Sequence, residues 1–208
     1  MKKSVLAILA LALGFTMGFA QEQKLPAPQK SGGKNIMETL WSRGSTNEFS
    51  PRMLSDQDLS NLLFATIGVN RENGKLTSPT ARNLQEIRVF VFTGKGVSEY
   101  LNKSHSLKPL AKGDHRGLVA KNQDWVKTAP VVLVTVADEK KFGNSDMPSK
   151  VIMGVDAGIV TENINMFCAG SGLVTHPRMN MDIPAIKKLL GLDDSQTPLM
   201  NNPVGYAK

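Results

Sequence analysis

The chain contains a single cysteine, Cys168, and only three histidines. One thiol cannot form an internal disulfide, so a folded chain must be held together by its core. Cys168 lies in the apolar run NMFCAG, which predicts a buried, small hydrophobic side chain. His105, His115 and His176 lack the spacing of metal ligands, and the sequence therefore predicts no metal site.

Several common catalytic motifs are also missing. The chain has neither a Walker-type phosphate loop nor a nucleophile elbow. The stretch 170–172 contains two glycines, but it lacks the third glycine of a dinucleotide fingerprint and follows a predicted helix. The adjacent carboxylates at 138–139 and 193–194 suit solvated turns. The sequence thus does not support a hydrolase or a metalloenzyme.

The one long hydrophobic run lies at the N-terminus, from Val5 to Phe15. Two lysines precede it and small residues follow at 18–20, a pattern typical of a secretory signal peptide over residues 1–20. The run is short for a transmembrane span, and no cysteine follows it as a lipid-anchor site. We therefore expect an exported, periplasmic protein with no stable membrane anchor after cleavage. An uncleaved N-terminal anchor is the alternative.

Charge is modest and evenly distributed. The 208 residues carry a net charge of +7, and removal of residues 1–20 leaves 23 basic and 18 acidic residues. No long basic block is present, so nucleic-acid binding is not expected, although a small anionic ligand would suit the chain. With 41% hydrophobic residues the composition predicts one globular domain.

Periodicity and turn signals predict an α+β fold. Residues 21–35 are rich in Pro, Gly and Gln and predict an extended N-terminal tether before a domain at 36–208. A capping box at Ser55 and a stop at Gly68 define the clearest helix. Helices and strands do not alternate strictly, which favours an α+β sheet domain. We expect helices at 36–43, 55–68, 114–121, 151–171 and 183–192, strands at 89–92, 131–136 and 172–175, a hairpin at 96–110 and a partly strand-like C-terminus.

Four segments carry the functional signal, and they are SRGSTNEFS at 42–50, SPTARNLQEI at 78–87, the helix and its end DAGIVTENINMFCAGSGLVT at 156–175, and VGYAK at 204–208. The first contains Arg43 and Ser45, and a guanidinium next to a hydroxyl can bind a phosphate. Each segment alone is a weak signal. Their joint order along the chain is more specific.

In this order the segments resemble the nitroreductase family of flavin enzymes. Arg43, Ser45 and position 47 match an Arg-x-Ser-x-(Arg or Lys) motif, and 79–85 matches Pro-Ser-x-x-Asn followed by Gln. A helix that ends in Gly-Leu and a late Gly-Tyr before a basic residue complete the pattern. The resemblance covers residues 36–208, nearly the whole mature chain.

The resemblance implies an FMN cofactor and a central mixed or antiparallel sheet surrounded by helices. It also implies a homodimer in which both chains line each pocket. Arg43, Ser45 and Lys208 would hold the phosphate, Asn83 the polar edge of the flavin ring, and Gly172–Leu173 would approach the ring near N5. No protein nucleophile is needed. The full set of implied cofactor-binding residues is Arg43, Gly44, Ser45, Asn47, Pro79, Thr80, Asn83, Gln85, Gly172, Leu173 and Lys208.

Some positions depart from the family pattern. Asn47 stands where a cation is usual, which weakens support for the reduced flavin, and Gly44, Glu162 and His176-Pro177 also differ. The resemblance implies two-electron, ping-pong reduction of a nitroaromatic, a quinone or a similar acceptor by a small-molecule donor. The alternative is an exported protein that holds flavin or another ligand without turnover, because soluble NAD(P)H is not expected outside the cytoplasm. The sequence does not identify the donor or the acceptor.

Overall fold

The computed structural model describes residues 21–143 and 146–208, so the predicted signal peptide lies outside the described residues. The helices are α1 (Ile36–Ser42), α2 (Asp56–Ile67), α3 (Arg116–Ala120), α4 (Met147–Ser171) and α5 (Ile183–Leu190). The strands are β1 (Gln23–Lys24), β2 (Ile87–Thr93), β3 (Gly96–Leu101), β4 (Ser106–Lys112), β5 (Val131–Asp138), β6 (Leu173–Thr175) and β7 (Gln196–Tyr206). Short 3₁₀ turns lie at Ala81–Asn83, Asp124–Thr128 and Glu139–Lys141.

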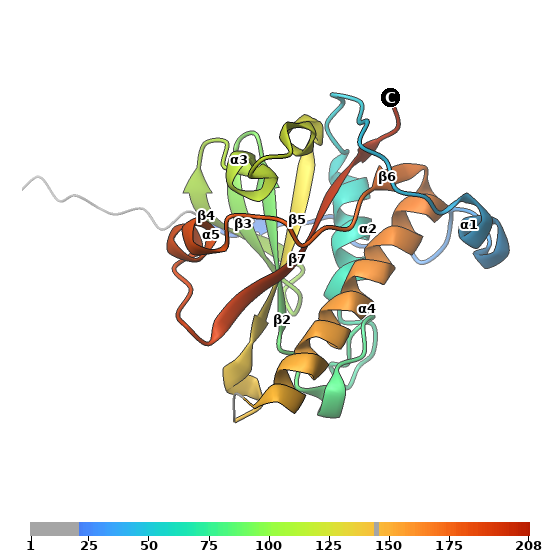
Figure 1. The fold of residues 1–208 in the computed structure, drawn as a ribbon. Helices are drawn as coiled ribbons and strands as arrows, with labels where there is room; N and C mark the ends of the chain where they lie inside the picture. The colour runs from blue at the N-terminus through green and yellow to red at the C-terminus, as the bar shows by residue number, and fades with distance from the viewer. Residues whose placement is uncertain (1–20, 144–145) are drawn as a thin grey trace, which may run out of the picture.

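One seven-stranded sheet forms the centre of the molecule, in the order β1-β4-β3-β2-β5-β7-β6 (Figure 1). All six neighbouring strand pairs are antiparallel. The α+β prediction with a sheet surrounded by helices is therefore confirmed. The predicted strands at 89–92 and 131–136 are the cores of β2 and β5, the central pair.

Helices cover both faces of this sheet. Side chains alternate along β2, so Val89 and Val91 pack in the cluster formed with α2 and α4. Phe90 and Phe92 pack in the opposite cluster, which contains residues of α3 and α5. Both faces of the central strands are buried, which explains why β2 and β5 are apolar at nearly every position rather than at every second one.

The helix with the clearest start and stop signals in the sequence, α2, begins and ends where predicted. Ser55 caps α2 by accepting the Asp58 N–H, and Gly68 is its C-cap, as predicted. α4 is longer than predicted, since Asp146 caps it and Pro148 occupies its first turn. α3 is shorter than the predicted 114–121 and spans five residues.

Regular structure begins earlier than the expected start near Ile36. Gln23–Lys24 pairs with β4, and the segment 21–35 then runs along the domain. The Leu25 N–H donates to the His105 carbonyl at 3.2 Å, the Gln29 N–H to Asn61 Oδ1 at 2.8 Å, and the Lys34 N–H to the Gly170 carbonyl at 2.8 Å. We call residues 21–35 the strap.

Two helices leave apolar side chains uncovered in the single chain. α4 leaves one face uncovered, because Val151 is 58% and Val155 57% exposed. α1 exposes Ile36, Met37, Leu40 and Trp41, of which Trp41 is 87% exposed. No helix in the described part of the chain is long and apolar enough to span a membrane. The exposed apolar faces of α1 and α4 are suited to contact with another surface.

Candidate functional site

Three segments that are distant in sequence meet at the C-terminal end of α4. Ser45 forms a parallel bridge with Thr175, and the Thr46 N–H donates to the Thr175 carbonyl at 3.2 Å. On the other side of β6, Leu173 pairs with Tyr206 of β7. This register brings the predicted residues at 43–47, 172–173 and 208 into one cluster, which we call the C-terminal cradle.

Gly172 forms the open turn of this cradle. It is the C-cap of α4 with φ 78°, a left-handed conformation that favours glycine. A Cβ added there would have no neighbour within 4 Å, so the turn faces open space. The Gly172 N–H donates to the Cys168 carbonyl. Gly172 therefore offers close approach to a ligand rather than a free N–H.

The cradle carries two unpaired cations. Arg43 is the C-cap of α1, Lys208 ends the chain, and both are exposed. Neither forms an ion pair within the part of the chain that the structure describes. Ser45 and Asn47, also exposed, lie on the same segment as Arg43. Two free cations beside hydroxyl and amide groups suit an anionic group such as a phosphate.

Tyr206 fixes the C-terminal strand beside the cradle. Its hydroxyl donates to Asp58 Oδ2 at 2.5 Å, and the Arg52 guanidinium lies 4.2 Å from its ring centroid. Burial tends to raise the pKa of Asp58, but hydrogen bonds from Ser55 and Tyr206 and the charge of Arg52 outweigh it, so the pKa lies below its usual value. Asp58 is thus a charged anchor for the end of β7, which Lys208 follows by two residues.

His176 lies next to the cradle in place of an apolar side chain. Its ring centroid is 5.1 Å from that of Trp125, and it contacts the backbone of Thr46. Burial, and then the charge of Arg178, lower the pKa of His176. The ring therefore behaves as a neutral packing group at neutral pH rather than as a third cation.

The second group of predicted residues, at 79–85, lies elsewhere in the single chain. Its Ala81 N–H donates to Asp156 Oδ2 at 2.9 Å, in the first half of α4. From 156 to 172 the helix rises about 24 Å at 1.5 Å per residue. Pro79, Thr80, Asn83 and Gln85 are therefore not brought together with the cradle in one chain.

The loop 79–85 has a strained backbone. Arg82, Asn83 and Gln85 have φ values of 53°, 56° and 52°, although none is a glycine. Two bonds of Gln85 hold this shape: its N–H donates to Thr80 Oγ1 at 2.9 Å and its Nε2 donates to the Gly74 carbonyl at 3.0 Å. Strain of this kind persists only where the surroundings impose it, and it is common in ligand-binding loops.

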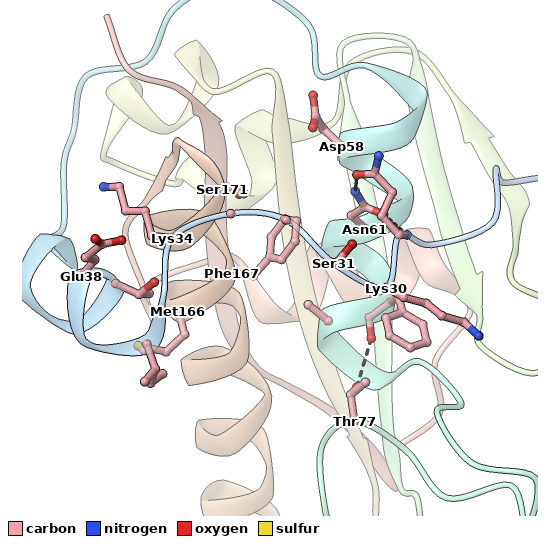
Figure 2. A pocket seen from close by; sticks show the side chains of 18 residues that line it. Lys30, Ser31, Lys34, Glu38, Asp58, Asn61, Thr77, Met166, Phe167 and Ser171 are labelled. Atoms are coloured by element: carbon pink, nitrogen blue, oxygen red, sulfur yellow. Dashed lines mark hydrogen bonds between the residues drawn. The ribbon is translucent and has the colours of Figure 1, made fainter.

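A cavity of about 870 Å³ lies between α2, α4 and the strap (Figure 2). Phe64 of α2, and Met166 and Phe167 of α4, supply apolar walls, and the strap crosses the cavity with Lys30 and Lys34. The wall ends at Gly170–Ser171, directly before the Gly172 turn. No predicted cofactor residue lines it. The cavity could not be predicted from the sequence, because the strap that closes it has the composition of a free tether.

Comparisons with known proteins agree with this architecture. The profile of the Nitroreductase family matches residues 40–206. The curated protein "Putative nitroreductase MJ1384" of Methanocaldococcus jannaschii is 25% identical over 91% of this chain and 98% of its own length. The crystal structure of a putative nitroreductase from Ralstonia eutropha is 29% identical in sequence to this chain. The match covers 92% of this chain and 91% of the Ralstonia chain, with a TM-score of 0.83.

A more distant structure shares the fold alone. The NADPH:FMN oxidoreductase of Vibrio harveyi, solved with NAD⁺, is 18% identical, covers 84% of this chain and 70% of its own, and has a TM-score of 0.65. The family match spans most of the chain and includes the cradle segments 43–47, 172–175 and 204–206. This chain belongs to the nitroreductase family.

Proposed function

We propose that this chain is an FMN-dependent oxidoreductase that passes two electrons from a small-molecule donor to a nitroaromatic, a quinone or a similar acceptor in a ping-pong cycle. The observation that carries the proposal is the C-terminal cradle. Three segments of a chain that belongs to the nitroreductase family meet there. Arg43 and Lys208, which form no ion pair with any described residue, flank the open turn at Gly172.

The residues of the cradle fit the cofactor. Arg43 and Lys208 offer charge-assisted bonds to a phosphate, and Ser45 offers a neutral hydroxyl. At Gly172 the absence of a Cβ leaves room for a flat ring system to lie against the backbone. FMN, when bound, supplies the electron transfer, while the chain binds it, orients it and limits the access of water. No side chain is required as a nucleophile.

We further propose that the working unit is a homodimer with two equivalent sites. The cradle and the loop 79–85 lie about 24 Å apart along α4, so one chain cannot close one site with both. In a two-fold dimer the loop of one chain can lie over the cradle of its partner. The exposed faces of α1 and α4 offer the apolar surface that such an association requires.

Export and the electron donor belong to the same proposal. Residues 1–20 have the pattern of a signal peptide, and soluble nicotinamide cofactors are not expected outside the cytoplasm. The Vibrio harveyi neighbour is named for NADPH and FMN, so NADPH and NADH are the first donors to test. A protein-borne or quinol donor is the alternative that export favours.

Purified mature protein, residues 21–208, provides the test. We expect a yellow protein that releases FMN on denaturation, identified by chromatography against FMN, FAD and riboflavin. Reduction of its flavin by NADPH, NADH or a chemical reductant, followed by reoxidation with menadione or 4-nitrobenzoate, would establish turnover. Flavin that binds but never reoxidises with any acceptor supports a binding protein instead. A colourless protein that does not bind added FMN contradicts the proposal.

A further inference from the structure

Glu86 is a buried acid that the proposed function leaves unexplained. It directly follows the loop 79–85 and is fully buried, at 0% exposure. Asp156 of α4, 4% exposed, lies within hydrogen-bonding reach of its carboxyl group. Asp156 apart, neither Glu86 carboxylate oxygen receives a hydrogen bond from another described residue. Buried polar side-chain atoms without such partners are uncommon in folded proteins and call for an explanation.

The pair needs a proton. Two carboxylates carry only acceptors, so a contact between them is favourable only when one of them is protonated and donates. Among the described residues, no nearby cation replaces that proton. Arg88 forms its ion pair with Glu99 at 2.7 Å, and the Arg82 guanidinium lies 5.5 Å from the Phe142 ring. β5 supplies no side-chain cation either. Its hydrogen bond to Glu86 joins two backbone groups, since the Asp138 N–H donates to the Glu86 main-chain carbonyl at 3.1 Å.

Burial and then the contact with Asp156 raise the pKa of Glu86 to about 7. The Glu86 carboxyl therefore holds its proton under mildly acidic conditions and loses it above neutrality. The titrating carboxyl group is buried and lies at the end of the loop 79–85, which the family resemblance assigns to flavin binding.

The same carboxyl pair holds both ends of that loop. Near its start, the Ala81 N–H donates to Asp156 Oδ2 at 2.9 Å. At its end, Glu86 follows Gln85, the last of the three residues with positive φ. Loss of the proton would set two buried negative charges against each other and push the loop away from α4. The strained backbone would then lose the contact that maintains it.

We propose that a protonated Glu86 donates a hydrogen bond to Asp156, and that this contact positions the loop 79–85 for cofactor binding. Glu86 is a positioning residue, since it acts through the loop and not by contact with the cofactor. The effect of Glu86 on cofactor binding rests on the proposed function, whereas its effect on the position of the loop 79–85 does not. Binding of FMN accordingly takes place best with the proton in place, and deprotonation weakens it.

The test compares wild type with Glu86→Gln, which keeps the shape and an N–H donor for Asp156 at every pH. FMN affinity is measured by fluorescence titration at about pH 6 and about pH 8.5. The FMN phosphate also titrates near pH 6, but it does so equally with both proteins. We expect wild type to lose roughly tenfold more FMN affinity than the variant between these two pH values. A roughly tenfold difference corresponds to a change of about one unit in the pKa of Glu86 on FMN binding. Parallel profiles for the two proteins would overturn the proposal.

Two further variants and a second readout separate the possible outcomes. Asp156→Asn still accepts the Ala81 N–H and should also flatten the profile, which covers the case that Glu86→Gln does not fold. Glu72→Gln removes an exposed carboxylate from the preceding turn and should leave the profile unchanged. Hydrogen exchange of residues 79–86 without FMN should show protection that falls with pH in wild type alone. If FMN does not bind at all, the proposed function fails, and equal protection in wild type and Glu86→Gln then refutes the positioning role independently.

Discussion

At the scale of single residues, the cradle depends on exposed cations that form no ion pair with any residue the structure describes. Arg43 is exposed at the end of α1, and nothing in the described chain neutralises it. A cation left free in this way costs little in stability and is available to a ligand. Its value should therefore appear in binding and not in the free energy of unfolding.

Replacement of Arg43 by Ala should weaken FMN binding by roughly ten- to a hundredfold. The reason is the loss of one charge-assisted hydrogen bond, typically worth ~1.5–3 kcal/mol. Fluorescence titration of FMN measures the effect, and Lys150→Ala, an exposed cation at the far end of α4, is the matched control. Equal affinity of wild type and Arg43→Ala would remove Arg43 from the site. Chemical denaturation should show no difference between them.

Glu86 predicts an unusual dependence of stability on pH. Its pKa is about 7 in the folded chain against an ordinary value of 4.5, so the folded state binds the extra proton between these values. The free energy of unfolding should therefore fall as pH rises from about 4.5 to about 7, and this contribution should be constant above that. Glu86→Gln should flatten this part of the curve. Urea titrations at several pH values test it, and equal slopes for both proteins would contradict it.

At the scale of elements, the sequence predicts helix ends and strands that depend on neighbouring residues in the chain. It does not predict segments whose conformation depends on contacts with distant residues. The cap at Ser55, the stop at Gly68 and the strand at 89–92 follow from chemistry within a few residues. Two features do not. The strap packs because distant groups, the Asn61 side chain and the Gly170 carbonyl, accept its N–H groups. The left-handed backbone of the loop 79–85 is likewise imposed by its neighbours.

Gly33→Ala should loosen the strap. Gly33 has φ 79°, and an added Cβ would lie 2.8 Å from the Gly170 carbonyl oxygen, beside the bond from Lys34. A strain of about 1 kcal/mol or more predicts at least roughly fivefold faster tryptic cleavage at Lys30 and Lys34. Gly191→Ala is the matched control, since its φ of 64° is equally left-handed but its Cβ would meet open space. Unchanged cleavage of Gly33→Ala would show that the strap is not held at this point.

At the scale of the whole molecule, the order of motifs predicted the cradle but not the distance to the loop. Arg43, Gly172 and Lys208 come together because β6 lies between the 43–47 segment and β7. Nothing in the motifs themselves shows that 79–85 lies at the opposite part of α4, because that depends on the length and direction of one long helix. A site that uses both groups has to be completed by a second chain.

The exposed face of α4 gives this requirement a test. Met147, Val151 and Val155 are exposed there, and Gly154 and Gly158 have open space around them, so a second helix can approach closely. Val155→Asp places a charge in the proposed contact and should convert the dimer to a monomer. FMN should be lost in parallel, because each site loses the wall formed by the partner.

Light scattering combined with absorbance detection measures mass and bound flavin on the same sample. Wild type should elute as a dimer with one FMN per chain, and Val155→Asp as a monomer with little flavin. Met179→Asp, which adds the same charge at an exposed methionine outside α1 and α4, should remain a flavin-loaded dimer. Dilution of wild type should release flavin at the concentration where the chains separate, since dissociation opens both sites together. A monomer that keeps stoichiometric FMN would exclude a site shared between two chains and would require the loop 79–85 to act elsewhere.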